Sequence, residues 1–151
     1  MFLPFEKKEK ENMLKNVPKI LSPELLKILA EMGHGDEILI ADGNFPSASN
    51  GQRVVRADGH GGLEILKAVL TMIPLDTYAD ENFMLMATTQ GDPTPSIWAE
   101  YLDVANALDS NVRQGIIERQ AFYERSRKAY AIIATGESAI YANILLKKGV
   151  I

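Results

Sequence analysis

The stretch Leu21–Asp42, LSPELLKILAEMGHGDEILIAD, holds a helix pattern followed directly by a strand pattern, and it decides the fold class. Ser22 is a suitable N-cap and Pro23 suits the first position of a helix. Apolar residues then recur on one helical face, at Leu25, Ile28, Leu29 and Met32. We expect a helix that ends at Gly33, with this glycine in the left-handed conformation.

The segment EILIA, residues 37–41, is a short apolar run typical of a buried strand that ends at Asp42. Strand and helix patterns alternate through the rest of the chain. Further strand patterns lie at 52–59, 82–89, 115–118, 131–137 and 141–151, and helix patterns at 62–74, 96–108 and 121–131. Strands separated by helices predict an α/β layered sheet, in which sites form outside the strand ends.

The length of 151 residues and the composition predict one globular domain. Apolar residues make up 46% of the chain and charged residues 24%, which does not suggest disorder. We interpret residues 1–12 as a mobile N-terminal extension and residues 13–151 as the functional domain. The net charge of -4 argues against nucleic acid as a partner, because phosphate binding requires a concentrated basic surface.

The chain contains no cysteine, which excludes disulfides, thiolate catalysis and cysteine-ligated metal sites. No apolar run approaches the roughly 20 residues that a membrane span requires. These two observations predict a soluble, cytoplasmic protein with no membrane partner.

His34 is the most prominent candidate for chemistry. It lies between Gly33 and Gly35, which would let a ligand approach the backbone closely, and Asp36 and Glu37 follow it. Histidine titrates near neutral pH and serves as a general acid or base, although a histidine after a helix can also simply interact with the helix dipole. We favour the functional interpretation, with Asp36 or Glu37 orienting the ring.

Other polar motifs are weaker. Asp42 ends a strand, where α/β proteins place ligand carboxylates, but Asp-Gly is also a common turn signal, and locally the turn is favoured. The loop ADGHGG, residues 57–62, lacks the spacing of the common phosphate-binding fingerprints, so we interpret His60 as a loop residue. A metal site formed by His34, Asp36 and Asp42 is a weak pattern, and we expect no metal.

The aromatic residues of the helix patterns are predicted to pack first and to bind ligands second. Trp98 and Tyr101 lie three residues apart, at the spacing of neighbours on a helix. Phe122, Tyr123 and Tyr130 also follow helix and strand spacing, and we assign them to the core.

Ordered blocks of the chain resemble the ribose pyranase and fucose mutarotase family, and in particular its L-fucose mutarotase branch. The similarity extends from about Val17 to Val150. Its blocks are LSPELLKILAEMGHGDEILIAD, NFP, RADG, FYER, TGE and YANILLKKGV. The ribose branch tends to have Gly-His-Thr-Asp and a histidine at the position of Arg119, whereas GHGDE and ERQAFYER here are similar to the fucose branch.

This resemblance implies a single-domain, layered α/β/α fold with a mixed sheet, and an isomerase that interconverts sugar anomers without cofactor or metal. It implies that His34 is catalytic and that the sugar-binding positions are Asp42, Arg119, Tyr141, Ala142 and Asn143. Family members form ring-shaped homo-oligomers, often decamers, with sites at subunit interfaces. L-fucose is the implied substrate.

Two departures keep alternatives open. DGNFP differs from the Asp-Ala-His-Phe-Pro of many bacterial members, so the contact made by Asn44 is open. YAN replaces the Tyr-Gly-Asn common in the fucose branch and occurs in the ribose branch, which keeps D-ribose or a related monosaccharide open as substrate. A further alternative is a monosaccharide-binding module without catalysis.

The spacing of the candidate residues poses a geometric problem. An extended segment 38–41 separates His34 from Asp42 by roughly 13 Å, too far for both side chains to contact one hydroxyl. Either the loop around His34 folds back, or two subunits complete one site. The resemblance favours the second arrangement, with His34 of one subunit meeting the YAN segment of another.

Overall fold

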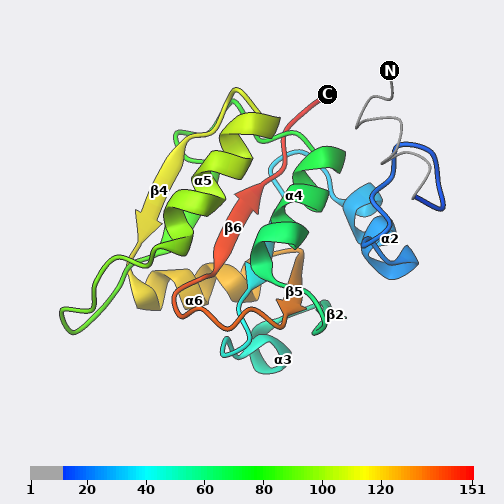
Figure 1. Ribbon diagram of the computed structural model, residues 1–151. Helices are drawn as coiled ribbons and strands as arrows, with labels where there is room; N and C mark the ends of the chain where they lie inside the picture. Colours follow the sequence, from blue (N-terminus) through cyan, green and yellow to red (C-terminus); the bar gives the residue numbers. More distant parts are fainter. Residues whose placement is uncertain (1–11) are drawn as a thin grey trace, which may run out of the picture.

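The computed structural model describes residues 12–151, which form a six-stranded sheet with helices on both faces (Figure 1). Residues 1–11 of the predicted extension lie outside the described residues. The strands are β1 (Glu37–Ala41), β2 (Val54–Ala57), β3 (Phe83–Met86), β4 (Gln114–Ile117), β5 (Ala131–Thr135) and β6 (Ile144–Lys147). The helices are α2 (Pro23–Glu31), α3 (Ser47–Asn50), α4 (Gly62–Met72), α5 (Ile97–Leu108) and α6 (Arg119–Lys128).

The sheet is mixed, as predicted, and one strand accounts for this. Its order is β2-β5-β1-β6-β3-β4, and β6 runs antiparallel to both of its neighbours, β1 and β3. The other strands are parallel to one another. The carboxyl ends of β1, β3 and β4 therefore lie at the same edge of the sheet as the amino end of β6. We call this row of strand ends the carboxyl edge, and the row at the other end of the strands the amino edge.

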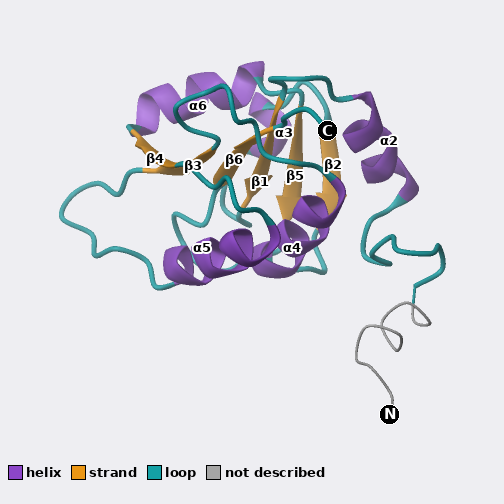
Figure 2. Cartoon of the chain, turned by 90° about the horizontal axis from the view of Figure 1, so that it is seen from above, coloured by secondary structure: helices purple, strands orange, loops and turns teal. Residues whose placement is uncertain are grey.

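Two apolar cores, one on each face, make the layered α/β/α fold that was predicted (Figure 2). Side chains of β1 alternate between the faces, as strand geometry requires. Ile38 and Ile40 pack in the core covered by α2, α4 and α5. Leu39 and Ala41 pack on the other face, with Phe122 of α6. Burial on both faces explains why EILIA is continuously apolar.

Helix α2 begins as predicted but ends differently. The Ser22 hydroxyl accepts a hydrogen bond from the Leu25 amide at 3.1 Å, as an N-cap does. The prediction that Gly33 is left-handed is wrong. The C-cap is Met32, in an extended conformation, and the glycine of this loop that has a positive φ is Gly35, at +86°. The ammonium of Lys148 donates to the last carbonyls of the helix, at Leu29 and Met32, so no left-handed turn is needed there.

Several element boundaries differ from the sequence patterns, and two of these differences affect the candidate site. Helix α6 begins at Arg119 rather than at residue 121, because the Glu118 carboxylate accepts hydrogen bonds from the first free amides, those of Gln120 and Ala121. Strand β6 begins at Ile144 rather than at Tyr141, whose φ of 55° is incompatible with a strand.

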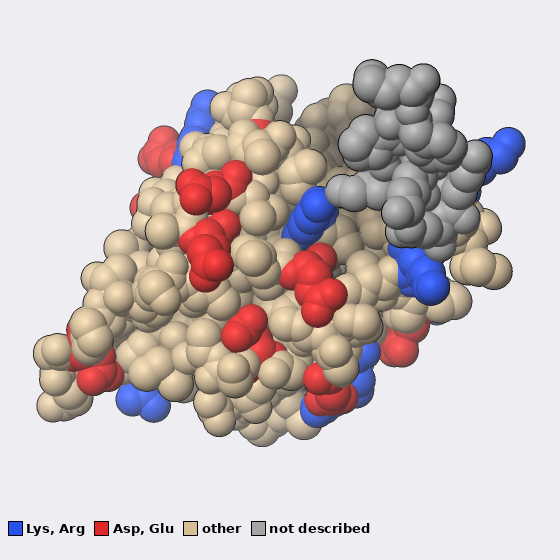
Figure 3. Space-filling model, in the orientation of Figure 1, with Lys and Arg blue, Asp and Glu red and all other residues tan. Residues whose placement is uncertain are grey.

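On the face drawn in Figure 3, acidic side chains lie across the middle and basic side chains lie mostly toward the margins. This distribution agrees with the net charge of -4. Within residues 12–151, none of the helices has the length and apolar character needed to cross a membrane.

Candidate functional site

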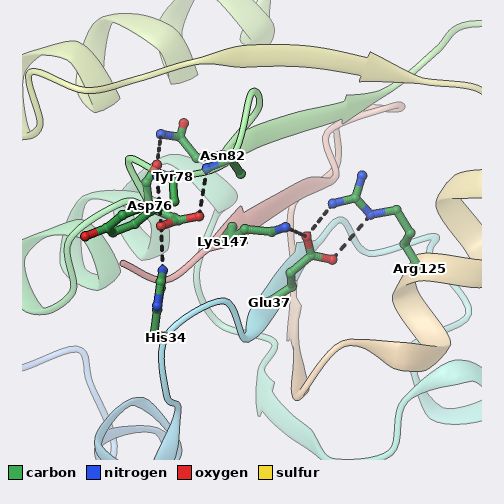
Figure 4. A network of polar contacts seen from close by, with 8 residues as sticks. His34, Glu37, Asp76, Tyr78, Asn82, Arg125 and Lys147 are labelled. Atoms are coloured by element: carbon green, nitrogen blue, oxygen red, sulfur yellow. Dashed lines mark hydrogen bonds and ion pairs between the residues drawn. The ribbon is translucent and has the colours of Figure 1, made fainter. Parts of the chain in front are cut away.

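His34 lies at the amino edge, in a group that we call the His34 cluster, made of His34, Asp76 and Tyr78 (Figure 4). Its Nε2 is 2.9 Å from Oδ1 of Asp76, and its ring centroid is 5.1 Å from that of Tyr78. The His34 side chain is 47% exposed, whereas that of Asp76 is only 4% exposed. An exposed imidazole is thus held from behind by a buried carboxylate, which leaves its other ring nitrogen, Nδ1, for a ligand.

Asp76 is fixed by its own loop. Its carboxylate also accepts hydrogen bonds from the backbone amides of Tyr78 and Ala79, at 3.2 and 3.1 Å. Burial acts to raise the pKa of Asp76, but the hydrogen bonds from His34 and from these amides outweigh it and hold the pKa below its ordinary value. A carboxylate that stays ionised accepts the ring N–H and favours one ring orientation.

The sequence interpretation missed Asp76, and its choice of Asp36 or Glu37 to orient the ring is wrong. Asp36 instead accepts a hydrogen bond from the Gly33 amide, at 2.8 Å. Glu37 pairs with Arg125 and Lys147, away from the imidazole (Figure 4).

The second group lies at the carboxyl edge. We call Asp42, Tyr141, Ala142 and Asn143 the carboxyl-edge cluster. Oδ2 of Asp42 accepts a hydrogen bond from the Ala142 amide at 3.1 Å, and Oδ1 of Asn143 accepts one from the Asp42 amide at 2.8 Å. The structure therefore brings together residues about a hundred positions apart in the sequence.

Asp42 is both a turn residue and a buried carboxylate. Its Oδ1 accepts hydrogen bonds from the amides of Asn44 and Phe45, each at 3.0 Å, as in an Asx turn. Only 4% of the residue is exposed. Burial raises the pKa of Asp42 above its ordinary value, although these amides, that of Ala142 and the Asn143 side chain oppose the shift. The Asn44 side chain itself is exposed.

Neighbouring segments hold the Asp42 turn in place. The Gly43 amide donates to the Glu137 carbonyl at 2.8 Å, and the Thr135 hydroxyl donates to the Ala41 carbonyl at 2.6 Å. The Glu137 carboxylate accepts from the Gly62 amide at the start of α4, at 3.0 Å. A side-chain carboxylate therefore already binds the start of α4, where the sequence loop 57–62 had been weighed as a phosphate site. His60 of this loop is partly exposed and lies beside Glu64.

Tyr141 links the cluster to the loop between β3 and α5. Its hydroxyl donates to Asp92 at 2.6 Å and contacts the Thr89 hydroxyl at 3.1 Å. The Thr89 amide also donates to it, at 3.3 Å. This loop and the YAN segment thus form one hydrogen-bonded unit.

Two aromatic rings, those of Tyr123 and Phe45, lie between Arg119 and the carboxyl-edge cluster. Its guanidinium lies 5.5 Å from the centroid of the Tyr123 ring, and Tyr123 lies 5.4 Å from Phe45, which follows Asp42 in the turn. Tyr123, assigned to the core from the sequence, is only partly buried, whereas Phe122 is buried completely.

The two clusters lie at opposite edges of the sheet, with β1 between them. The amide of Gly35 donates to the Lys148 carbonyl at the end of β6, so the loop around His34 does not fold back toward Asp42. The metal set considered from the sequence, His34, Asp36 and Asp42, is therefore not assembled. Residues 12–151 contain no group of three or more acidic or histidine side chains arranged to hold a metal ion.

Comparison with known proteins identifies the relatives of the chain. Residues 15–151 match the RbsD / FucU transport protein family. The chain belongs to this family. This confirms the resemblance noted in the sequence, and the family match covers β1–β6 and both clusters.

Relatives in the RbsD / FucU family are similar over nearly the whole chain. A fucose mutarotase of Bos taurus is 48% identical over 147 residues, which cover 92% of this chain and 95% of the relative. The fucose mutarotase of Streptococcus pneumoniae, solved in complex with L-fucose, has a TM-score of 0.87 and 48% identity, covering 91% of this chain and 99% of that one. FucU of Bifidobacterium longum has a TM-score of 0.87 and 54% identity over the same shares.

Proposed function

We propose that this protein is an L-fucose mutarotase, which interconverts the α and β anomers of L-fucose. The observation that supports the proposal is that the chain has both an exposed imidazole held by a carboxylate and, separately, a hydrogen-bonding cluster of polar groups. The chain is also 48% identical to a fucose mutarotase solved with L-fucose. The geometry supplies an acid or base in one cluster and polar groups for sugar hydroxyls in the other.

Anomer exchange needs only proton transfer. The ring oxygen of the pyranose gains a proton while the anomeric hydroxyl loses one, which gives an open aldehyde that rotates and closes on its other face. We assign this proton transfer to His34, with Asp76 orienting the ring. A positioned acid or base of this kind typically accelerates a reaction by about 10² to 10⁴.

The carboxyl-edge cluster is assigned to sugar binding. The Asn143 oxygen accepts a hydrogen bond from the Asp42 amide, and we assign the amide nitrogen of the same side chain to a sugar hydroxyl. Asp42 retains acceptor capacity on Oδ2, and the forked guanidinium of Arg119 suits a hydroxyl or a developing oxyanion. Tyr141 and Ala142 complete the binding segment.

We further propose that one active site takes His34 from one chain and the carboxyl-edge cluster from another, in a ring-shaped homo-oligomer, a decamer, in the cytoplasm. The location of the two clusters at opposite edges of one sheet supports this, because the span of β1 is roughly 13 Å or more.

Complementation tests the shared site. His34→Ala and Asp42→Ala each remove one half, and each variant alone should be inactive. When the two are unfolded together, mixed and refolded, roughly a quarter of the sites should regain both wild-type halves in a random assembly. A mixture that stays inactive, although each variant assembles like the wild type, would show that both halves belong to one chain.

Saturation-transfer NMR tests the activity itself. The protein should speed exchange between the L-fucose anomers, and His34→Ala should abolish this while the melting temperature is retained. A binding module would broaden the sugar lines without faster exchange. D-ribose in the same assay tests the alternative substrate, with Arg119→His as the informative variant, since the ribose branch tends to have histidine at this position.

A further inference from the structure

Two aromatic residues of α5 donate hydrogen bonds to consecutive carbonyls of the YAN segment. The indole Nε1 of Trp98 donates to the Tyr141 carbonyl at 2.7 Å. The Tyr101 hydroxyl donates to the next carbonyl, that of Ala142, at 3.2 Å. Trp98 is 7% exposed and Tyr101 is fully buried, so water competes little for either bond. These residues lie on one face of α5 and were expected first of all to pack.

The segment that they hold needs such support. Tyr141 has a φ of 55°, a conformation that side chains other than glycine adopt at a cost and keep only where the surroundings fix it. Residues 141–143 precede β6, so the carbonyls of Tyr141 and Ala142 are outside the ladder of the sheet. The two donors of α5 replace the partners that the sheet does not provide.

Tyr101 is itself packed closely against the start of α4. A Cβ atom on Gly62 would lie 1.9 Å from the Tyr101 hydroxyl, so the start of α4 approaches this side chain as closely as a glycine allows. The direction of the hydroxyl is thereby fixed by a second helix. Its donor position is built into the packing of α4 against α5.

We propose that Trp98 and Tyr101 are positioning residues of the sugar-binding half-site. By fixing the carbonyls of Tyr141 and Ala142, they set the direction of the backbone that brings the Ala142 amide and the Asn143 side chain onto Asp42. The inference rests on the proposed function. It assigns to the two side chains a role in substrate affinity rather than in proton transfer, because His34 lies at the other edge of the sheet.

Phenylalanine variants separate positioning from packing. Both Trp98→Phe and Tyr101→Phe keep an aromatic ring and remove the donor. Tyr101→Phe removes only the hydroxyl, whereas Trp98→Phe also shortens the buried ring system, so Tyr101→Phe is the cleaner variant. Tyr130→Phe is the matched control, since it removes a hydroxyl that bonds to Glu31 of α2 at 3.0 Å, away from the carboxyl-edge cluster. In the anomer-exchange assay, each α5 variant should raise KM for L-fucose by about fivefold or more with kcat within about twofold of wild type. Tyr130→Phe should leave both unchanged.

A binding measurement makes the test independent of catalysis. Trp98 is the only tryptophan of the chain, and its indole bonds to the proposed sugar-binding segment, so L-fucose should change its fluorescence. In the His34→Ala background, Tyr101→Phe should raise the Kd for L-fucose by about the factor seen in KM.

Each outcome decides one of the two proposals. A wild-type protein that does not speed exchange refutes the proposed function, and the fluorescence Kd then still tests the positioning role. A wild-type KM in folded Trp98→Phe and Tyr101→Phe, together with a wild-type fluorescence Kd in Tyr101→Phe, which keeps Trp98, refutes the positioning role while the function stands. A fall in kcat that tracks a loss of melting temperature, in these variants and in Tyr130→Phe alike, also refutes it, because stability alone would then explain the effect.

Discussion

The clearest prediction concerns Asp76→Asn, which keeps the shape of the side chain and removes its charge. One oxygen of the carboxylate accepts from both His34 and the Tyr78 amide, and the other accepts from the Ala79 amide. An asparagine has one acceptor oxygen, so its amide nitrogen must face either the imidazole side or the Ala79 N–H. The variant cannot satisfy all three partners.

The size of the effect follows from the contact. A hydrogen bond to a charged group contributes about 1.5–3 kcal/mol net when buried. Because the His34 side chain is 47% exposed, solvent screening puts this bond at the lower end, about 1.5 kcal/mol, which corresponds to about tenfold in rate. We therefore expect kcat for L-fucose exchange to fall about tenfold, with little change in KM.

Saturation-transfer NMR gives both constants, and the control is Asp80→Asn, an exposed acid of the same loop. The control should keep the wild-type rate. If Asp76→Asn also keeps it, or raises KM alone, the imidazole does not depend on this carboxylate and the assignment of Asp76 is refuted.

Three further predictions concern stability. Asp42→Asn should lower the melting temperature by about 4–8 °C. If the new NH₂ group of the asparagine faces the Ala142 N–H, that buried donor loses its acceptor, at a cost of about 2 kcal/mol. An unchanged melting curve would contradict this. The pKa of Asp42 is raised in the fold, so the native state binds more protons than the unfolded state, and urea melts should show the contribution of Asp42 to stability falling as pH rises through and above 3.8. The pKa of Asp76 is lowered, so the contribution of Asp76 to stability should be complete above 3.8 and lost at lower pH. Asp42→Ala and Asp76→Ala should each abolish their own part of this pH dependence. Gly62→Ala should lower the free energy of unfolding by about 1–3 kcal/mol in urea melts, because the new methyl group would clash with the Tyr101 hydroxyl. A free energy of unfolding equal to that of the wild type would mean that α4 and α5 separate easily.

Local sequence signals were sufficient for most of the fold. The run EILIA predicted β1 because a strand buried on both faces must be apolar throughout. Ser22 predicted the start of α2 because its hydroxyl bonds within the first turn. The two differing boundaries that affect the candidate site, at Arg119 and Tyr141, depend on the Glu118 side chain and on a left-handed residue.

The parts of the site that sequence reasoning missed depend on contacts between distant residues. His34 was a prominent candidate because glycines flank it, but its partner Asp76 lies 42 positions away, after α4, and no local pattern joins them. Trp98 fitted the apolar pattern of a helix, and that pattern cannot reveal that its indole N–H meets a carbonyl 43 positions away. An amphipathic pattern reports burial and not hydrogen bonding.

The single antiparallel strand explains how one chain can carry the two proposed half-sites at opposite edges. β6 begins directly after Asn143, in the carboxyl-edge cluster, and ends at Lys147. The next residue, Lys148, accepts from the Gly35 amide beside His34, and its ammonium holds the end of α2. A parallel strand in this place would begin at the amino edge and could not follow the YAN segment directly. The direction of β6 therefore places one cluster at each end of a single strand, which is the arrangement that the proposed sharing of a site between two copies requires.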